Sequence, residues 1–378
     1  MAFSYWESKQ WISDRDLLIV GGGIVGLSAA LRAKTLRPDW EISVIERHPF
    51  SGGGSTRNAG FACFGSATEL QEDRQSLGDK AALELVRKRW EGLQLLRETL
   101  GDEAIGYQSC GSVELFLKGF DSSIQAPTDD ELKDINRWLQ PVTGEPSTFK
   151  RTLAEGFIEM NAPAIADCIA SPLEGSIDTG KMLGSLIQKV RNAGITIING
   201  CHVKGVRSNP NPQVCIAESD AEGTWFDAKN VLVATNAFAK QLAPNLDVTS
   251  APNHVMVTEP IPGLGLQPTV HLDAGYVYAR SIGERLLIGG GRHWGLQNES
   301  VIQKRLLQTL HRIWPIALDI PISHHWVGWL GVGSDRMPIH SILSPGIHAA
   351  VRLGGMGVAM GMQFGNEAAD RILKSPAK

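Results

Sequence analysis

The chain has 378 residues, 43% of them hydrophobic, and a formal net charge of −4 at pH 7. This length can bury roughly two to three domains' worth of core, while the interspersed charges disfavour nucleic-acid binding and no apolar run approaches the roughly 20 residues of a membrane-spanning helix. The charged start MAFSYWESKQWISDRD lacks a signal-peptide core, and the five cysteines form no CxxC pair, so we expect a reducing, cytoplasmic setting without a disulfide framework.

The first predicted elements are a strand, a glycine-rich turn and a helix. Leu17–Val20 is a continuous apolar run, typical of a central parallel strand that is covered on both faces. A run of good helix formers then extends to Leu36. The turn between them reads GGGIVG and fits the dinucleotide-binding pattern GxGxxG. The residues of this turn that we expect at a cofactor are Gly21, Gly23, Ile24, Val25 and Gly26.

Each glycine of the pattern has a separate role. Gly21 makes the tight turn, Gly23 lets a pyrophosphate approach the backbone, and Gly26 allows the helix to pack closely on the strand. A second strand, Glu41–Ile45, ends in Glu46, about 20 residues beyond the last glycine, where the 2′-hydroxyl of a ribose needs an acceptor. An acid at this place would repel the 2′-phosphate of NADP, which leaves FAD and NAD as the candidates.

The remainder of the chain does not continue the simple alternation expected of an NAD dehydrogenase. A small-residue stretch, Ser55–Ala67, is followed by helical and strand-like segments, and nucleotide-domain elements return much later. The predicted elements are, in chain order, a helix over Asp79–Leu100, a strand over Gly111–Phe116, a helix over Thr179–Ala193, strands over Ile195–Ile198, Val203–Val206 and Lys229–Val233, and a terminal helix after Leu353–Gly361.

The order and spacing of these motifs resemble the D-amino-acid oxidase/glycine oxidase superfamily of FAD-dependent oxidoreductases over nearly the whole chain. The motifs that carry the resemblance are GGGIVG with Glu46, STRNAG, LVATNA, YVYARSIGERLLIGG, LGVGSDRMPI and LGGMGVAMG. The RNAG loop and the Tyr-x-Arg pattern are most similar to gamma-glutamylputrescine oxidoreductase-like members. The resemblance selects FAD over NAD.

The resemblance also implies the fold class and the domain organisation. The expected fold is α/β, with a discontinuous Rossmann-like FAD-binding domain of residues 1–76, 172–249 and 329–378. A second, α+β domain with a substrate-binding β-sheet would comprise residues 77–171 and 250–328.

The family further implies which residues contact FAD. Glu46 would bind the adenosine ribose, with Arg47 near the adenine and the backbone of Val203 against it. The STRNAG loop would follow the pyrophosphate, ribityl chain and flavin, and the helix start in LGGMGVAMG would offer N–H groups to the negative charge of a reduced flavin. The residues expected at FAD outside the first turn are Glu46, Arg47, Ser55, Thr56, Arg57, Asn58, Ala59, Gly60, Val203, Ala234, Thr235, Asn236, Gly354, Gly355, Met356, Gly357, Val358 and Ala359.

The reaction that the resemblance implies is the oxidation of a C–N bond in a small amine or amino acid. A hydride would pass from the carbon beside a neutral amine to flavin N5, and dioxygen or another acceptor would reoxidise the flavin. Two alternatives stay open. One is a flavin dehydrogenase for another small substrate that passes electrons to a quinone or carrier, and the other is a non-catalytic FAD-binding redox sensor or assembly protein.

Candidate substrate residues lie on two predicted strands. Tyr276, Tyr278 and Arg280 alternate along one strand and therefore share a face. Arg280 can bind an anionic group bidentately, or it can pair with Glu284 at the surface. His254, beside the strand that ends at Thr258, is a weaker candidate because a lone strand histidine is usually structural.

Two further features bear on the chemistry. The pair His324–His325 looks like part of a metal site, but no cysteine or carboxylate pattern accompanies it, so we expect no metal. Amino-acid oxidases of the family carry an arginine in a Gly-x-Arg-Pro segment that binds the substrate carboxylate. Val332 occupies that place here, which favours an amine, an N-alkylated amine or an acid held by Arg280. Cys63 leaves a covalent flavin tether open, although a small buried residue is the simpler interpretation.

Overall fold

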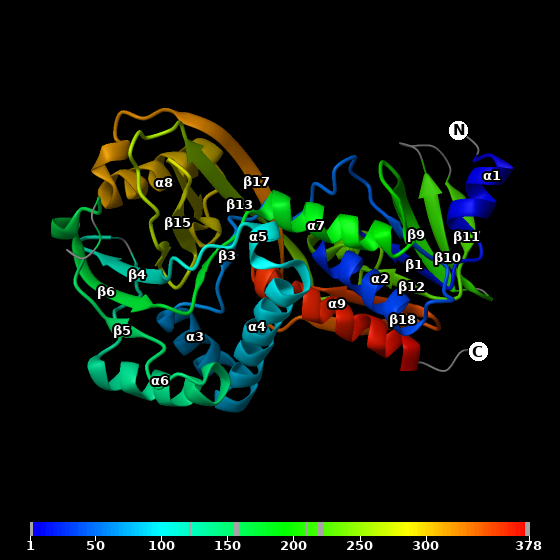
Figure 1. The fold of residues 1–378 in the computed structure, drawn as a ribbon, viewed down its shortest axis with the longest axis horizontal. Helices are drawn as coiled ribbons and strands as arrows, with labels where there is room; N and C mark the ends of the chain where they lie inside the picture. The colour runs from blue at the N-terminus through cyan, green and yellow to red at the C-terminus, as the bar shows by residue number, and fades with distance from the viewer. Residues whose placement is uncertain are drawn as a thin grey trace.

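The computed structural model describes residues 3–120, 122–154, 157, 159–208, 210–217 and 223–374. Two lobes, each built on a β-sheet, lie at opposite ends of an elongated molecule, and the long helix α4 (Asp79–Leu100) runs between them (Figure 1). In these ranges no helix is long and apolar enough to cross a membrane.

The sheet of the first lobe is parallel except at one edge. Its central strand β1 is buried at every position, as the apolar run predicts, and pairs in parallel with β2 on one side and β12 on the other. The chain therefore reverses its direction of progress across the sheet at β1, where α/β folds bind ligands. The strand order is β18 (Ile339–Ser344), β19 (Ile347–Val351), β12 (Val231–Val233), β1 (Leu17–Val20), β2 (Ile42–Ile45) and β8 (Thr196–Ile198).

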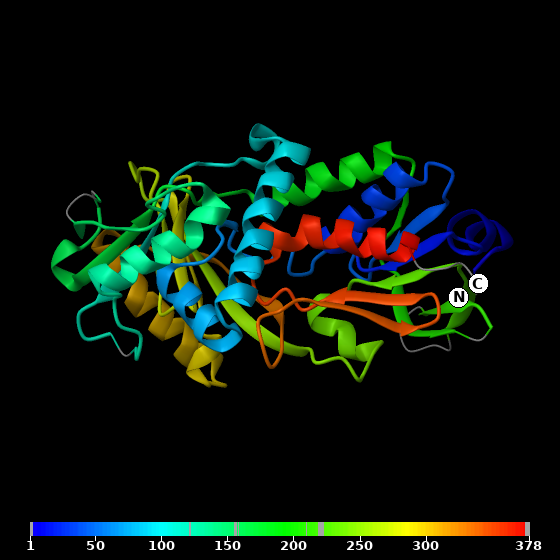
Figure 2. The same cartoon turned by 90° about the horizontal axis from the view of Figure 1, so that it is seen from below.

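Helices α2, α7 and α9 cover one face of this sheet, and α9 runs alongside α2 (Figure 2). Glycines allow the close approach: a Cβ at Gly365 of α9 would overlap the carbonyl oxygen of Val25, and one at Gly92 of α4 would overlap that of Ala359. The bounds are α2 (Ile24–Leu36), α7 (Thr179–Asn192) and α9 (Gly357–Lys374). The far end of the lobe carries α1 (Tyr5–Glu7), a π-helix (Ser8–Ile12) and the antiparallel strands β11 (Thr224–Asp227), β10 (Pro212–Ala217) and β9 (His202–Ser208).

The sheet of the second lobe is antiparallel apart from the parallel pair β14–β4. Helix α8 (Glu299–Ile313) packs on β13 and β16. The strand order is β17 (Ile322–Val332), β13 (Thr249–Thr258), β16 (Arg285–Gly290), β15 (Val277–Ile282), β14 (Thr269–Leu272), β4 (Ser112–Leu117), β6 (Ile165–Ser171) and β5 (Lys150–Arg151). The other helices are α3 (Ala67–Leu77), α5 (Asp102–Ile105), α6 (Asp129–Thr143) and 3-10 turns at Ala162–Ala164, Asn236–Gln241, Arg292–Trp294 and Pro315–Ala317.

A small two-stranded ladder connects the lobes. Strand β3 (Phe61–Ala62) pairs with β7 (Gly175–Ser176). The ring of Phe61 contacts the rings of His271 and Tyr278, which belong to the second sheet, in an edge-to-face arrangement. The loop before β3 therefore passes from the first sheet to the second.

The expected α/β fold class is confirmed, as are the strand at Leu17–Val20 and the helix at Asp79–Leu100. Helix α2 begins at Ile24, inside the glycine motif rather than after it, because Gly23 already serves as its N-cap. The predicted strand at 203–206 belongs to the separate three-stranded sheet. The division into domains stays a prediction, and strand β17 runs across its expected boundary at 328/329.

The close contact between α4 and α9 predicts that a larger side chain at Gly92 lowers the stability of the fold. Gly92→Ala should lower the free energy of unfolding by about 1–3 kcal/mol, because the methyl group has no room beside the Ala359 carbonyl. Gly184→Ala in α7 is the matched control, since nothing lies within 4 Å of its Cβ position, and it should leave stability unchanged or raise it by up to about 1 kcal/mol. Urea unfolding monitored by circular dichroism compares the two, and equal effects would contradict the tight contact.

Candidate active site

Two adjoining cavities extend from the carboxyl ends of the parallel strands toward the second sheet. The first is lined by the ends of β1, β2 and β12, and the second by the loop before β3, the start of α9 and the inner face of the second sheet. Both cavities are lined by the same residues where they meet, which are Gly54, Asn58, Leu330, Gly355 and Val358. An elongated ligand therefore has one continuous binding surface across the two lobes.

The glycine motif shapes the first cavity. Gly21 has a φ of 115°, and a Cβ there would lie 2.7 Å from the carbonyl oxygen of Ala234. A Cβ at Gly26 would overlap the carbonyl oxygen of Gly21, which confirms its role in helix–strand packing. The backbone N–H of Ile24 donates to Ser55 Oγ at 2.9 Å, so the loop is tied to the N-terminus of α2.

The side chain of Glu46 is held against the wall of the first cavity. Its Oε2 accepts from the backbone N–H of Gly22, and its Oε1 accepts from that of His48, both at 2.8 Å. Arg47 lies with its guanidinium 4.7 Å from the ring centre of Phe238. In the described part of the chain, the Oγ1 of Thr235 has no hydrogen-bond partner although it is buried. A buried polar atom that lines the cavity fits a polar ligand.

The start of α9 borders both cavities. Gly354 and Gly355, just before it, have φ values of 59° and 104°, and nothing lies within 4 Å of a Cβ position at Gly354. Helices α2 and α9 thus both direct a positive N-terminal end at the same continuous space.

The side chain of Asn58 braces the STRNAG loop. Its Nδ2 donates to the carbonyl oxygens of Gly54 and Ser55, and its Oδ1 accepts from the N–H of Gly60. Its polar atoms therefore shape the loop rather than project from it.

Most residues expected at FAD line a cavity. Those that do are Gly21, Gly23, Ile24, Val25, Glu46, Arg47, Ser55, Arg57, Asn58, Ala59, Val203, Ala234, Thr235, Asn236, Gly354, Gly355, Met356, Gly357, Val358 and Ala359. Gly26, Thr56 and Gly60 are absent from both linings.

The four predicted substrate residues divide differently. Tyr278 lines the second cavity, where its hydroxyl oxygen accepts from Asn253 Nδ2 at 2.5 Å. Tyr276, Arg280 and His254 line neither cavity. Arg280 is buried and donates from Nη2 to the carbonyl oxygen of Ile177 at 2.9 Å.

The alternation of strand β13 explains the position of His254. Asn253 faces the second cavity, so its neighbour in the sequence faces the opposite side, toward α8. Within the described ranges, the Oδ1 of Asn253 is buried without a hydrogen-bond partner, which leaves an acceptor at the cavity wall.

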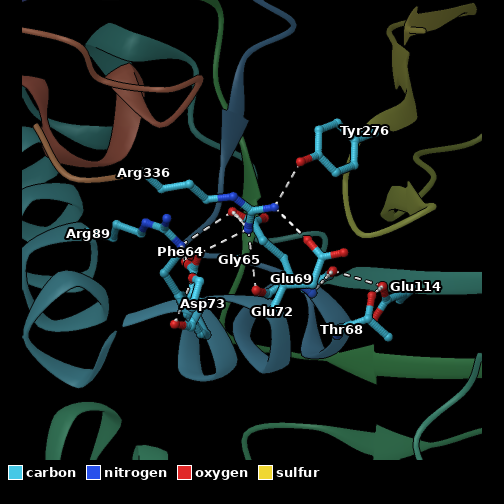
Figure 3. A network of polar contacts seen from close by, with 12 residues as sticks. Phe64, Gly65, Thr68, Glu69, Glu72, Asp73, Arg89, Glu114, Tyr276 and Arg336 are labelled. Atoms are coloured by element: carbon cyan, nitrogen blue, oxygen red, sulfur yellow. Dashed lines mark hydrogen bonds and ion pairs between the residues drawn. The ribbon is translucent and has the colours of Figure 1, made fainter. Parts of the chain in front are cut away.

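A charged network beneath the second cavity was not apparent from the sequence (Figure 3). Arg336 pairs with Glu72 at 2.6 Å and Asp73 at 3.0 Å, and donates to the hydroxyl oxygen of Tyr276 at 3.1 Å. Arg89 pairs with the same Asp73 at 3.0 Å and with Glu69 at 3.4 Å. Burial raises the pKa of Glu69, although the two arginines oppose this. The positive charge of Arg336 is therefore matched by nearby carboxylates.

Two further arginines line this cavity, Arg292 and the exposed Arg57, and Arg292 differs from Arg336 in its partners. Its guanidinium lies 4.5 Å from the ring centre of Tyr276, a cation–π distance. Over the described residues, no carboxylate forms an ion pair with it, and burial lowers its pKa. Arg292 is the second residue after strand β16, and no motif of the sequence pointed to it.

His271 and Glu174 form a buried pair at the second cavity. His271 Nε2 lies 3.3 Å from Glu174 Oε2, while the other carboxylate oxygen accepts from the N–H groups of Phe64 and Gly65. Burial by itself lowers the pKa of His271, but the hydrogen bond and charge of Glu174 outweigh it and leave the pKa raised. Burial also raises the pKa of the neighbouring Cys63 thiol far above its ordinary value. Whether Cys63 tethers the flavin covalently stays an open prediction.

We expected Val332 to be the apolar residue of the last strand that faces the substrate, but Leu330 lines the cavities instead. Leu330, two positions earlier on β17, lines both cavities, and Val332 lines neither. The side chain at the cavity is apolar in either case, so β17 supplies no arginine for a carboxylate.

The chain matches the family model of FAD-dependent oxidoreductases (DAO) over residues 16–371. Glycine oxidase from Geobacillus kaustophilus is 25% identical over 332 residues, covering 84% of this chain and 80% of that protein. Gamma-glutamylputrescine oxidoreductase from Escherichia coli is 25% identical over 364 residues, covering 91% and 80%.

Solved structures share the fold. L-proline dehydrogenase from P. horikoshii superposes with a TM-score of 0.75 at 18% identity, covering 97% of this chain and 95% of that one. Iminodiacetate oxidase from Chelativorans sp. gives a TM-score of 0.70 at 22% identity, covering 96% of each chain.

The hydrogen bonds of Glu46 predict its contribution to cofactor affinity. Glu46→Ala should weaken FAD binding by about 10- to 100-fold, because a charged acceptor contributes about 1.5–3 kcal/mol. Quenching of FAD fluorescence on titration into the apo-protein measures the dissociation constant. Glu41→Ala is the control, because Glu41 is an exposed residue that pairs with Arg15 at the other end of the same strand. An unchanged constant for Glu46→Ala would contradict the assignment.

Proposed function

The chain belongs to the DAO family of FAD-dependent oxidoreductases, and from this premise we propose that it oxidises a C–N bond of a small amine or amino acid to the imine. The observation that supports this reaction is the second cavity, which combines a histidine–carboxylate pair, an unpaired amide oxygen and an unmatched arginine beside the start of α9. These groups suit the binding and deprotonation of an amine that carries an anionic group.

The residues of this chain fit the cofactor of the family. The first cavity would hold the adenosine and pyrophosphate against Glu46 and the N-terminus of α2, and the start of α9 would face the flavin. The buried Oγ1 of Thr235 and the open backbone at Gly354 are features that a bound dinucleotide would satisfy. When bound, FAD supplies the acceptor for the hydride removed from the substrate carbon.

The side chains of the second cavity would prepare the amine. The Oδ1 of Asn253 would accept one N–H of the amine, since it has no other partner in the described part of the chain. His271 would take up a proton at Nδ1, because its Nε2 is engaged by Glu174. The rings of Phe61 and Tyr278, which meet edge to face, would exclude water from the same space.

Arg292 would bind the anionic group of the substrate. Arg336 is matched by carboxylates, Arg280 is directed at a backbone carbonyl, and Leu330 is apolar. Arg57 also lines the cavity without an ion pair among the described residues, but its side chain is exposed to solvent. Arg292 is therefore the desolvated cation of the cavity that lacks an acidic partner in that part of the chain. The relatives named for glycine, L-proline and iminodiacetate are named for amines that carry a carboxylate. We propose a substrate of this class, with dioxygen or another acceptor reoxidising the flavin. The five free cysteines suit a reducing compartment.

An anaerobic substrate screen tests the reaction. The purified FAD-loaded protein should lose its absorbance near the flavin band when mixed without oxygen with a carboxylate-bearing amine from a panel, and should regain it in air if dioxygen is the acceptor. Reduction that persists in air but reverses with a quinone would identify the dehydrogenase variant. A yellow protein that no amine or amino acid reduces would contradict the proposed substrate class.

Arg292→Gln tests the anion site separately from turnover. Binding of acetate to the oxidised holoenzyme, followed as a perturbation of the flavin spectrum, should weaken by about 10- to 100-fold, because a hydrogen bond to a charged group contributes about 1.5–3 kcal/mol. Acetamide binding should change little, since it carries no charge. Arg285→Gln is the control, since Arg285 lies on β16 and bonds to Thr258 and Ser323 outside the cavity. Equal weakening in both variants would contradict the role of Arg292.

A further inference from the structure

Two histidines and a glutamate meet on the outer face of the second sheet. Strands β13 and β17 pair so that His325 lies opposite Met256, which places His325 and His254 on the same face of the sheet. Helix α8 packs on β13, and its first residue is Glu299. Three elements that are distant in the sequence therefore bring their side chains to one point, away from the cavities.

The three ligand atoms are spaced as a tetrahedral metal site requires. His254 Nδ1 lies 3.4 Å from His325 Nε2, His325 Nε2 lies 3.5 Å from Glu299 Oε1, and the remaining edge, between His254 Nδ1 and Glu299 Oε1, is 3.8 Å. Zinc bound at about 2.0–2.2 Å by nitrogen and oxygen in a tetrahedron separates its ligand atoms by about 3.3–3.6 Å. The observed triangle needs only a small contraction of its longest edge.

The orientation of the two imidazole rings supports the same site. The ring planes differ by only 4°, and the ring centres lie 5.6 Å apart while the nitrogens lie 3.4 Å apart. The centre separation exceeds the nitrogen separation by roughly two ring radii, so the rings meet edge to edge with their nitrogens facing each other. Because the rings share nearly one plane, a metal bound beside the line that joins the two nitrogens would lie in the plane of both rings, as an imidazole ligand requires.

The surroundings provide charge and a further ligand. Glu299 contributes negative charge, and its Oε1 lies within ion-pair distance of both rings. The amide of Gln303 lies one helical turn after Glu299, within 3.4 Å of His325 Nε2. Because amide oxygen and nitrogen are assigned from their contacts, a rotated amide can present its oxygen to the same point.

We propose that His254, His325 and Glu299 bind a divalent transition metal, with zinc as the best-fitting ion, and that Gln303 or water takes the fourth position. The site would join β13, β17 and the start of α8, and so stabilise the second sheet without entering the reaction. Of the two adjacent histidines that the sequence singled out, only one belongs to it. His324 is exposed and its Nδ1 lies 2.9 Å from Ser323 Oγ.

Titration with Co²⁺ tests the proposal on the FAD-loaded full-length protein. Bound cobalt gives visible bands at longer wavelength than the flavin, and their intensity should saturate at one ion per chain, with Zn²⁺ displacing it. His325→Ala and Glu299→Gln should weaken Co²⁺ binding by at least about 10-fold, because each removes a ligand. His324→Ala, the adjacent exposed histidine, should bind as the wild type does.

Thermal unfolding provides the second measurement. Saturating Zn²⁺ should raise the melting temperature of the wild type and of His324→Ala, because a ligand that binds only the folded state stabilises it. It should have no such effect on His325→Ala. Absence of saturable binding in the wild type would overturn the site and leave a simple hydrogen bond between the two rings. Binding that survives in both ligand variants, or that is lost in His324→Ala, would overturn it as well.

Discussion

The close packing of α2 on β1 and of α9 on α2 is the constraint on which the rest of the site depends. A side chain at Gly26 would collide with the turn that leads from β1, and one at Gly361 or Gly365 would collide with Ile24 or Val25 of α2. Because these positions are glycines, the helices pack closely, and both start at the same edge of the parallel sheet. Their positive ends then face one continuous space, which suits a ligand that carries negative charge at two separate places.

The charged groups at the second cavity differ in how they are paired. Arg336 and Arg89 lie among three carboxylates and so contribute little net charge to a ligand. Arg292 rests on an aromatic ring instead, and in the described chain it has no acid to neutralise it. A guanidinium held in this way keeps its charge available, whereas its desolvation makes an anionic partner more favourable than water. Under the proposed function, the polar network supports the cavity and Arg292 binds the anionic group of the substrate.

The sequence was sufficient for features whose chemistry is local. The glycine motif, Glu46 and the apolar run of β1 lie within about 30 residues of one another, so their spacing alone placed them around the first cavity. The second cavity is assembled from α3, β13, β14, β17 and the turn after β16, and no local pattern records which residues meet there. Alternation correctly grouped Tyr278 with Arg280, yet the strand carries Arg280 beyond the cavity to Ile177. Glu174, which orients His271, comes from yet another segment.

Strand β13 links the two sites through its alternation. Asn253 faces the cavity and bonds to Tyr278, while the next residue, His254, faces α8 and the outer cluster. The same strand therefore positions Asn253 Oδ1 at the cavity and His254 Nδ1 on the opposite face of the sheet. A metal that fixes His254 to His325 would restrain β13 against β17 at the level of Asn253, since the two strands pair through this region. Under the proposed function the amide of Asn253 accepts an amine, which requires that its position relative to Tyr278 be held within fractions of an ångström. Rigidity on the outer face would then bear directly on the geometry of the inner one.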